Sequence, residues 1–409
     1  MSYKLAEDDK RIPLDNERVT IVGTFAELGE IDNITLVGAG GTSLVYCARM
    51  GTDTKRYCIL KEYWPKERSK YDAEYMRDFD TGEIVLVGDE KRKVRERSLQ
   101  DVRKNYEKSV TEKLYSDPEK LGSNSNHVFY MSGCFDIGDT YYYVIETTKG
   151  QTLYEKVLNA PKRKLDIASA LKRAKIMIEL VRFMFYDRGY CHGDLKPENI
   201  WCGNDSDNND VGENLYIMDF GSAFSWKKYK ERKYANEQDY LDFAEEIVSN
   251  PGIGWSSENY KSVLVANLYG AKMEYKLQLL ESARLQSAKN LLEQMKKIDV
   301  SVDLYAVVKI FYFMIVGSDY DMDNPMGDEL LSEIVGCEIG VAKEINRIML
   351  KNANERYCDV DELYRELQCL EALYNKEASP FVWMQNVIND AEFDLHDFDI
   401  NLLCDVKLN

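Results

Sequence analysis

Hydrophobic and polar residues alternate over short stretches in the first third of the chain, a pattern that is typical of β-strands. Turn-forming residues separate these stretches, which predict strands at 34–37, 44–49, 56–63, 128–134 and 140–146. A different spacing, with apolar residues three or four positions apart, runs from 99 to 114 and predicts one helix. We therefore expect a β-rich N-terminal part with one helix.

After Gly150 the pattern becomes helical. Apolar residues recur at helical spacing over 165–186, and the chain beyond Glu258 is mostly helical in pattern. A loop at 192–199 and a short strand at 214–218 are the predicted interruptions. The second part of the chain is therefore predicted to consist mainly of α-helices.

These patterns predict an α+β fold with two lobes. The N-lobe at 31–147 is small and β-rich, the C-lobe at 148–374 is larger and helical, and a hinge lies at 147–150. Within the C-lobe the helical pattern is clearest over 277–295.

Three segments fall outside this regular pattern. Residues 1–30 form an N-terminal extension, and 204–214 is a polar segment that predicts a solvated hairpin tip. Residues 375–409 form an acidic C-terminal tail whose interspersed aromatic residues predict docking onto the body of the protein or onto a partner, or else a loosely packed cap.

The composition narrows the possible functions. Of 409 residues, 53 are basic and 71 are acidic, which gives a formal net charge of −18. A general nucleic-acid binder and a protein that adheres to anionic lipid both need a surplus of Lys and Arg, so this charge argues against both classes. The hydrophobic fraction of 44% supplies a substantial core and excludes a disordered chain.

The sequence also bears on the compartment. It contains no apolar run of the roughly 18 residues that a membrane span needs, and its charged N-terminus lacks the apolar core of a secretory signal. The nine cysteines form no CxxC pair, which favours a reduced, cytoplasmic chain over a disulfide framework. With three histidines, a His-rich metal site is nearly excluded.

Glycines cluster between the first two predicted strands, at Gly38, Gly40 and Gly41. Without a Cβ, such a turn lets backbone N–H groups approach phosphate oxygens, although a glycine-rich hairpin is more often only a turn. Lys61 follows at the end of an apolar strand, where its charge needs a phosphate or a carboxylate unless it extends into solvent. Taken singly, both features are ambiguous.

The loop at 192–199 has the sequence His-Gly-Asp-Leu-Lys-Pro-Glu-Asn. Asp194 can accept a proton from an attacking hydroxyl, while Asn199 in the same loop can hold a metal ion. Lys196 between them can neutralise charge on a transferring phosphoryl group. Asp219 ends an apolar strand directly before Phe-Gly, which suits an Mg²⁺ ligand.

In this order, the motifs resemble those of the eukaryotic-like (Hanks-type) Ser/Thr protein kinase family. The resemblance extends from Leu36 to about Leu370, which is most of the chain. It implies an ATP-dependent enzyme that uses Mg²⁺. The His-Gly-Asp form of the loop and the Lys-Glu-Tyr-Trp-Pro run at 61–65 favour a bacterial member of the family.

The resemblance implies which residues bind the nucleotide. Glycines cover the phosphates, an aliphatic residue lies over adenine, a lysine meets the α- and β-phosphates, and the hinge offers backbone groups to the base. The matching positions are Gly38, Gly40, Gly41, Val45, Lys61, Glu146 and Thr148, with Ile145 as the gatekeeper. As the helix partner of Lys61, Glu107 is the first choice and Glu112 the alternative.

The resemblance also implies the catalytic and metal-binding residues. Asp194 matches the catalytic base, and Lys196 matches the lysine beside the γ-phosphate. Asn199 and Asp219 match the Mg²⁺ ligands.

Further matches lie in the helical part of the sequence. Asp303 resembles the aspartate that braces the catalytic loop at the start of a central helix. Glu258 resembles the glutamate that ends the activation segment, and Arg356 resembles its buried ion-pair partner. Because breaking a buried pair from one side is costly, we expect both to be structural.

The segment between Glu258 and Asp303 is unusually long for the family, which implies a helical insertion at about 259–300. We expect an extra helix pair that serves a partner or an atypical substrate, or else an elaborated helical lobe.

The sequence also departs from the family pattern at three positions. Ser43 replaces the third glycine, and Ile59 replaces an alanine and adds bulk beside the adenine pocket. Gly193 replaces the arginine that pairs with an activation-loop phosphate in the family, so phosphorylation is not expected to act as a switch by that route. The basic cluster that follows is either a solvated loop or a site for acidic substrates or phosphates; it comprises Lys227, Lys228, Lys230, Arg232 and Lys233.

The predicted function is transfer of the γ-phosphoryl group of ATP to Ser or Thr hydroxyls of proteins, since Lys196 and Pro197 resemble the Ser/Thr-specific form. A pseudokinase or scaffold module is one alternative, supported by the three departures. A small-molecule kinase is the other, because His-Gly-Asp also occurs there. Expected partners are protein substrates or a regulatory protein, with no nucleic acid and no membrane span; nothing in the sequence indicates an oligomeric state.

Overall fold

The computed structural model describes residues 5–14, 31–50, 56–66, 73–115, 131–147, 149–203, 214–250, 252–254, 256–278 and 280–376. The chain divides into two compact units. The first comprises the residues up to Lys156 together with 183–257 and 263–298, and the second comprises 157–182, 258–262 and the residues from Asp299 on. The lobe and tail boundaries expected from the sequence stay predictions.

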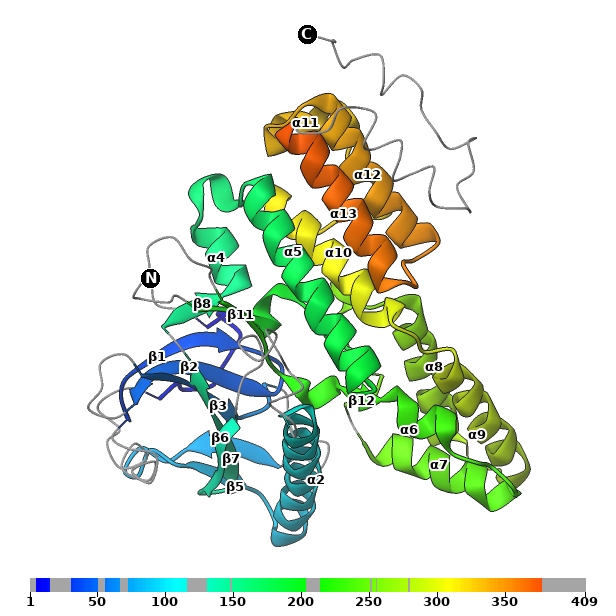
Figure 1. Ribbon diagram of the computed structural model, residues 1–409. Helices are drawn as coiled ribbons and strands as arrows, with labels where there is room; N and C mark the ends of the chain where they lie inside the picture. Colours follow the sequence, from blue (N-terminus) through cyan, green and yellow to red (C-terminus); the bar gives the residue numbers. More distant parts are fainter. Residues whose placement is uncertain are drawn as a thin grey trace. The chain divides into compact units, whose positions relative to one another are not determined.

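The first unit contains a five-stranded antiparallel sheet with the order β1-β2-β3-β7-β6 (Figure 1). Its strands are β1 (Ile31–Ala39), β2 (Ser43–Met50), β3 (Tyr57–Tyr63), β6 (Met131–Ile137) and β7 (Thr140–Thr147). Each overlaps a strand predicted from the alternating pattern, and residues 128–130 lie outside the described ranges. The side chains of Leu44, Leu60 and Val144 are buried in its core.

Between β3 and β6 the chain forms a hairpin and one helix. These elements are β4 (Glu74–Arg77), β5 (Ile84–Val87) and α2 (Glu90–Tyr115). The sequence predicted the helix only from 99 to 114. Most side chains from 90 to 98 are exposed and charged, so the first two turns carry no apolar stripe that sequence periodicity could detect.

A buried ion pair lies within this part of the first unit. The side chains of Glu62 on β3 and Arg77 on β4 are both 0% exposed, and their charged atoms are 2.7 Å apart. Tyr46 and Tyr142 donate their hydroxyl hydrogens to the same carboxylate. Glu62 is therefore fully hydrogen-bonded within the protein, which is the condition under which a buried charge is tolerated.

The described N-terminal segment, 5–14, packs on the sheet. Arg11 is 6% exposed and donates to the carbonyl oxygens of Ser43 and Trp64, over 3.3 and 2.8 Å. The backbone N–H of Leu14 donates to the hydroxyl of Tyr46 over 3.0 Å. This part of the predicted N-terminal extension is thus attached to the β-rich core, next to the end of the glycine-rich turn.

Two small sheets carry the segments that lead to the candidate site. One has the order β11-β10-β8 and the other pairs β12 with β9. Their strands are β8 (Gly150–Thr152), β9 (Tyr190–Cys191), β10 (Ile200–Gly203), β11 (Asn214–Ile217) and β12 (Phe224–Ser225). The 3₁₀ turns η5 (Pro197–Asn199) and η6 (Phe220–Ser222) adjoin them. The segment 192–199 precedes β10, as expected, and 204–213 lies outside the described residues.

Four helices follow β12 in the first unit. They are α6 (Trp226–Glu231), α7 (Glu237–Ser249), α8 (Val263–Leu277) and α9 (Glu281–Lys296), of which the last three pack against one another (Figure 1). The helices α8 and α9 lie within 259–300, and whether they are an insertion relative to the family stays a prediction. The predicted helical pattern over 277–295 begins too early, because Leu277 ends α8 and α9 starts only at Glu281.

The second unit is helical. Its helices are α5 (Ile167–Arg182), α10 (Ser301–Val316), α11 (Asp328–Val335), α12 (Ile339–Asn354) and α13 (Val360–Asn375), with the short turns η3 (Pro161–Arg163) and η7 (Glu258–Tyr260). Every residue of α10 from Ser301 to Ile315 is buried, including Asp303, which explains its continuous apolar sequence.

Two further elements complete the described chain. The helix α4 (Leu153–Asn159) precedes η3, and the π-helical turn η4 (Phe183–Asp187) continues directly from α5. The prediction of a helix over 165–186 therefore corresponds to α5 and η4. Together, the antiparallel sheet and the helices confirm the α+β fold class.

The expected buried pair of Glu258 and Arg356 is wrong. The side chain of Glu258 is 84% exposed, and it pairs with Lys261, three residues further along the same turn. Within the described chain, Nη1 of Arg356 is buried without a hydrogen-bond partner. The local contact satisfies Glu258 in solvent, so no distant arginine is needed.

Other expectations concern residues that lie largely outside the described ranges. These are most of the N-terminal extension and the acidic tail from residue 377 on. In the part that is described, no helix is both long enough and apolar enough to cross a membrane. The eight cysteines within the described ranges are all free thiols.

Candidate active site

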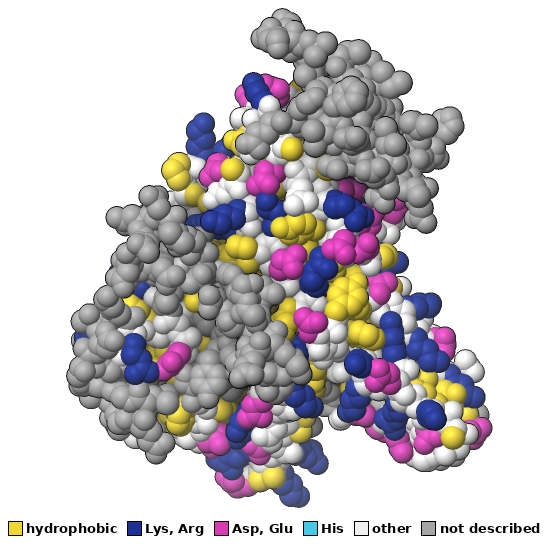
Figure 2. All heavy atoms as spheres, in the orientation of Figure 1, with side chains coloured by type: hydrophobic (Ala, Val, Ile, Leu, Met, Phe, Trp, Pro, Cys, Tyr) yellow, Lys and Arg dark blue, Asp and Glu magenta, His cyan; other side chains and the backbone are white. Residues whose placement is uncertain are grey.

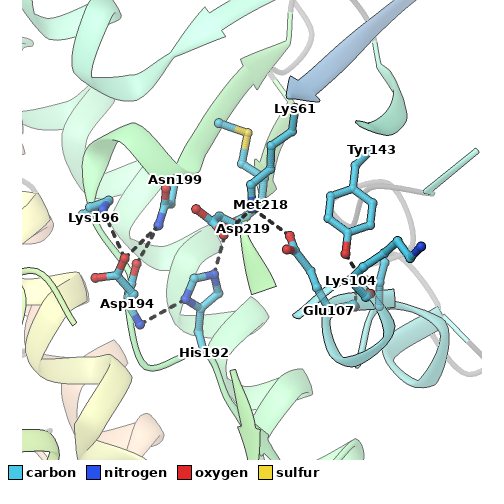
Figure 3. Close-up of polar contacts among 11 residues, drawn as sticks. Lys61, Lys104, Glu107, Tyr143, His192, Asp194, Lys196, Asn199, Met218 and Asp219 are labelled. Carbon is cyan, nitrogen blue, oxygen red and sulfur yellow. Dashed lines mark hydrogen bonds and ion pairs between the residues drawn. The ribbon is translucent and has the colours of Figure 1, made fainter. Parts of the chain in front are cut away.

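Lys61 on β3 is the centre of a group of charges in the first unit (Figure 3). Its Nζ lies 2.8 Å from Oε1 of Glu107 on α2 and 2.7 Å from Oδ1 of Asp219, which follows β11. The Lys61 side chain is 12% exposed, so its charge depends on these two carboxylates. The alternative partner, Glu112, instead lies 3.9 Å from Lys108 on the surface of the same helix.

The surroundings shift the pKa values of the two carboxylates in opposite directions. Burial alone would raise the pKa of Asp219, but the Lys61 ammonium outweighs it and lowers this pKa to about 2. Burial raises the pKa of Glu107, with Lys61 opposing that shift. Burial also disfavours the Lys61 ammonium, yet the two acids raise the pKa of Lys61. Asp219 is thus ionised over the physiological pH range.

Asp194 and Lys196 form a second group in the segment before β10. The Asp194 carboxylate is 3.1 Å from Nζ of Lys196, and its other oxygen accepts a hydrogen bond of 2.6 Å from the backbone N–H of Ser257. Lys196 also donates to the Ser257 hydroxyl over 2.9 Å. Burial lowers the pKa of Lys196, but Asp194 and more distant acids raise it overall. The segment at Ser257 thereby fixes both side chains.

His192 and Asn199 hold this segment in shape. The His192 ring lies with Nε2 3.1 Å from the carbonyl oxygen of Met218, and its Nδ1 accepts the Asp194 backbone N–H over 3.3 Å. The ring therefore carries its proton on Nε2. Asn199 donates from Nδ2 to the Asp194 carbonyl oxygen over 2.8 Å, which leaves its amide oxygen as the atom that can meet a cation.

The strands β10 and β11 bring Asn199 and Asp219 to the same place. They pair antiparallel with Ile200 opposite Ile217, so the residue before β10 and the residues after β11 lie at one end of the pair. The Met218 backbone N–H donates to the Asn199 carbonyl oxygen over 3.0 Å. Asp219 itself has a left-handed backbone, with φ 67°, which is uncommon outside glycine and concentrates at functional sites.

The sequence profile of the protein kinase domain family matches residues 101–329, which is more than half of the chain. The chain belongs to the protein kinase family. The resemblance to protein kinases is thereby confirmed, while the Ser/Thr type and a bacterial origin stay predictions.

Curated relatives match this kinase over short stretches. A probable myosin light chain kinase of Dictyostelium discoideum is 31% identical over 101 residues, which are 25% of this chain and 24% of that protein. CBL-interacting protein kinase 15 of Oryza sativa subsp. japonica is 40% identical over 91 residues, 22% of this chain and 19% of that protein. The match thus covers less than a quarter of either relative.

Among solved structures, the kinase domain of Mycobacterium tuberculosis PknI is similar to this kinase. The comparison covers 83% of this chain and 97% of that domain, with 11% sequence identity and a TM-score of 0.41.

Kinases of this family use ATP with Mg²⁺, and the donor set of this kinase fits that use. Among the described residues, no group of three or more His, Cys, Asp or Glu side chains is positioned to hold a metal ion alone. Mg²⁺ is usually held by one or two protein side chains together with phosphate oxygens and waters. The Asn199 amide oxygen and the Asp219 carboxylate are ligands of that kind, at one end of β10 and β11.

The predicted phosphate-covering turn of this kinase joins β1 and β2. Gly38 belongs to β1, and Gly40 and Gly41 form the exposed turn. The Gly40 backbone N–H donates to the Ser43 carbonyl oxygen over 2.9 Å and closes the turn. These residues have the backbone exposure that phosphate binding requires, and their role stays a prediction.

The structure describes some of the residues expected to form the hinge. Glu146 lies at the end of β7 and pairs with Arg56, while Thr148 lies outside the described residues. Ile145 precedes Glu146 and is half-buried.

Sequence reasoning did not name Trp201 or Met218, which pack against residues expected to lie around adenine. Val45, Ile59 and Ile145 belong to one apolar cluster, together with Met218 and Trp201 on β10. The Trp201 side chain is 0% exposed and Ile59 is 1% exposed, so both fill this cluster. The only available signal was the position of Trp201, two residues after Asn199, because an indole in an apolar strand otherwise indicates core.

The backbone conformation at position 193 explains why the residue there is glycine. Its φ is +78°, a conformation that side chains with a Cβ rarely adopt, and a Cβ there would lie 3.0 Å from the Ser222 carbonyl oxygen. Arginine, which the family usually has at this position, would be strained. The departure at Gly193 is therefore built into the conformation of the segment.

The basic cluster at 227–233 has acidic neighbours. Lys228 and Arg232 both pair with Glu246 on α7, and Lys227 lies 3.9 Å from Glu231. Figure 2 shows basic and acidic side chains intermixed over the helices α6 to α9, at its lower right. Both interpretations of the cluster, a solvated loop and a site for acidic groups, stay predictions.

Proposed function

We propose that this protein kinase transfers the γ-phosphoryl group of Mg-ATP to Ser or Thr hydroxyls of protein substrates in the cytoplasm. The observation that carries the proposal is the shared location of two charge groups: Lys61 with Glu107 and Asp219, and Asp194 with Lys196. Asn199 and Asp219, at one end of β10 and β11, link the two groups. A regulatory protein is a further expected partner.

Each side chain has a role that its surroundings support. Asp194, held by Ser257 and Lys196, orients the substrate hydroxyl and accepts its proton as general base. Lys196 stabilises negative charge that develops on the transferring group. Lys61, kept charged by its two acids, binds phosphate oxygens, and Glu107 fixes its position.

Asn199 and Asp219 would hold the magnesium ion. When bound, Mg²⁺ neutralises charge on the phosphate oxygens. The pKa of Asp219 is lowered to about 2, so this ligand is already ionised at neutral pH and has no proton to lose before it binds a metal ion. Pro197 follows Lys196 in the form that resembles Ser/Thr-specific kinases, which supports the choice of hydroxyl.

Turnover by the Asp219→Ala variant tests the enzymatic assignment. Removing this carboxylate takes away a magnesium ligand and a partner of Lys61, so we expect ATP turnover to fall by about 10²-fold or more. The measurement is release of product from labelled ATP, followed by mass-spectrometric mapping of phosphorylated residues. Equal background rates in both proteins would favour a scaffold, and labelling of metabolites without any polypeptide would favour a small-molecule kinase.

A scaffold or pseudokinase is the second candidate, and the buried cluster of Ile59 and Trp201 favours it. Both side chains lie among the residues expected to enclose adenine, so the adenine ring must displace part of this cluster when ATP binds. Apolar clusters of this kind are closely packed, and their rearrangement opposes binding. We infer that nucleotide affinity is weakened by Trp201 in particular.

Trp201→Leu should therefore tighten ATP binding by about tenfold, which corresponds to about 1.4 kcal/mol. The smaller side chain leaves room for the base while keeping an apolar contact. Titration calorimetry with Mg-ATP measures the change in Kd. The matched control is Trp226→Leu, whose indole stacks on Phe185 outside the cluster, with ring centroids 4.6 Å apart. Unchanged or weaker binding by a folded Trp201→Leu protein would refute this role.

A further inference from the structure

A buried lysine lies on α8. Lys272 is 5% exposed, and its ammonium donates to the carbonyl oxygens of Asn250 and Ile253, over 2.6 and 2.7 Å. Burial and the nearby charge of Lys276 lower the pKa of Lys272 to about 8. Burying a charged amine is unfavourable unless hydrogen bonds replace its lost hydration, and here the two backbone carbonyls provide them.

The backbone that Lys272 holds lies directly on the segment after Asp219. A Cβ at Gly252 would be 1.7 Å from the Gly221 carbonyl oxygen and 3.3 Å from the Ser222 Cα, so the two backbones touch there. The side chain of Asn250 accepts the Gly252 backbone N–H over 3.1 Å and fixes the bend. Lys272 therefore binds the backbone on both sides of Gly252, the point at which this segment meets Gly221.

Tyr106 on α2 contacts the same two segments. Its hydroxyl donates to the Ala223 carbonyl oxygen over 2.6 Å and is hydrogen-bonded to the side chain of Asn250. The residues at 221–223 are thus held by Tyr106 and by the backbone that Lys272 anchors. Asp219, two residues before Gly221, has the left-handed backbone with φ 67° that such support must maintain.

We propose that Lys272 is a positioning residue for Asp219, through which the α8–α9 helix pair keeps the magnesium-binding end of β11 in its working conformation. The consequence for catalysis rests on the proposed function, whereas the contact between Lys272 and the backbone does not. Lys272 touches neither the nucleotide site nor any residue assigned to it. Its effect should appear in the metal dependence of the reaction before it appears in nucleotide binding.

The test compares Lys272→Met with wild type by two readouts. The first is the Mg²⁺ concentration for half-maximal rate at saturating ATP, which we expect to rise by about tenfold, with a smaller change in kcat at saturating Mg²⁺. The second is amide hydrogen exchange of the peptides that cover 217–223, which we expect to become at least several-fold faster. Both follow from loss of the two hydrogen bonds to the backbone at 250–254.

Two variants serve as controls. Lys276→Met changes an exposed lysine four residues further along the same helix and should leave both readouts within about twofold of wild type. Lys272→Arg keeps a charge and several donors and should restore at least part of both. If Lys272→Met does not fold, Lys272→Gln, whose shorter amide cannot reach both carbonyls, provides the same comparison.

A folded Lys272→Met or Lys272→Gln protein with wild-type exchange at 217–223 and unchanged Mg²⁺ dependence would overturn the proposal. Equal effects of Lys272→Met and Lys276→Met would also overturn it. If wild type transfers no phosphate, the proposed function fails, whereas hydrogen exchange still decides whether Lys272 supports the segment after Asp219. The two failures are therefore distinguishable.

Discussion

Asp194→Asn should lower kcat by about 10²–10⁴-fold, the range that a general base contributes. Asparagine has nearly the same shape, and its amide oxygen can still accept the backbone N–H of Ser257, which now lies 2.6 Å from the carboxylate. It cannot accept a proton from the substrate hydroxyl, and it loses the charge that pairs with Lys196. Steady-state transfer of label from ATP to a protein substrate measures the effect.

The same variant should bind ATP nearly as wild type does, because Asp194 acts on the acceptor hydroxyl. Titration calorimetry checks this second half of the prediction. The matched control is Asp187→Asn, which makes the same chemical change at an exposed aspartate in η4. A fully active Asp194→Asn protein would show that another group accepts the proton or that the catalytic assignment is wrong.

Arg77→Met should lower the free energy of unfolding by about 3–5 kcal/mol, the usual result of removing one partner from a buried ion pair. The Glu62 carboxylate would remain 0% exposed, with only the hydroxyls of Tyr46 and Tyr142 to stabilise its charge. Arg77 also donates to the carbonyl oxygens of Ile12 and Gly82, each over 2.8 Å, and these contacts are lost as well. Urea unfolding followed by circular dichroism measures the change.

Arg97→Met is the control for this variant. Arg97 lies 2.6 Å from Asp139, but its side chain is 45% exposed, so its loss should change stability by no more than about 1 kcal/mol. Adding Glu62→Gln to Arg77→Met removes the unpaired charge and should recover part of the loss. Equal destabilisation by the single and the double variant would mean that packing, and not charge, is responsible.

The candidate site could be located from the sequence because its residues stand where local patterns change. Lys61 follows an apolar run within β3, Asp219 comes two residues after β11, and Asp194 lies in a polar loop between two apolar segments. Glu107 was the helix partner of Lys61 that the family resemblance implied, and the structure brings its carboxylate to Lys61. The catalytic roles of these residues stay predictions until the variants are measured.

Other features depend on contacts that no local pattern reveals. The expected pair of Glu258 and Arg356 failed because a nearer lysine satisfies Glu258 in solvent. Trp201 was not named because a buried indole in a strand gives the same apolar signal whether or not it packs against Ile59 and Met218. Lys272 is a polar residue in a helix, and only the fold reveals which carbonyls it meets.

The backbone conformation at Gly193 limits how this kinase could acquire regulation by phosphorylation. A glycine codon lies one base from an arginine codon, so mutation alone would readily supply the arginine that relatives use to sense a phosphate. Here the exchange would meet a backbone at φ +78° and the Ser222 carbonyl oxygen 3.0 Å from the new Cβ. The surrounding segment would have to adjust as well, so this single exchange would not by itself install control by a phosphate.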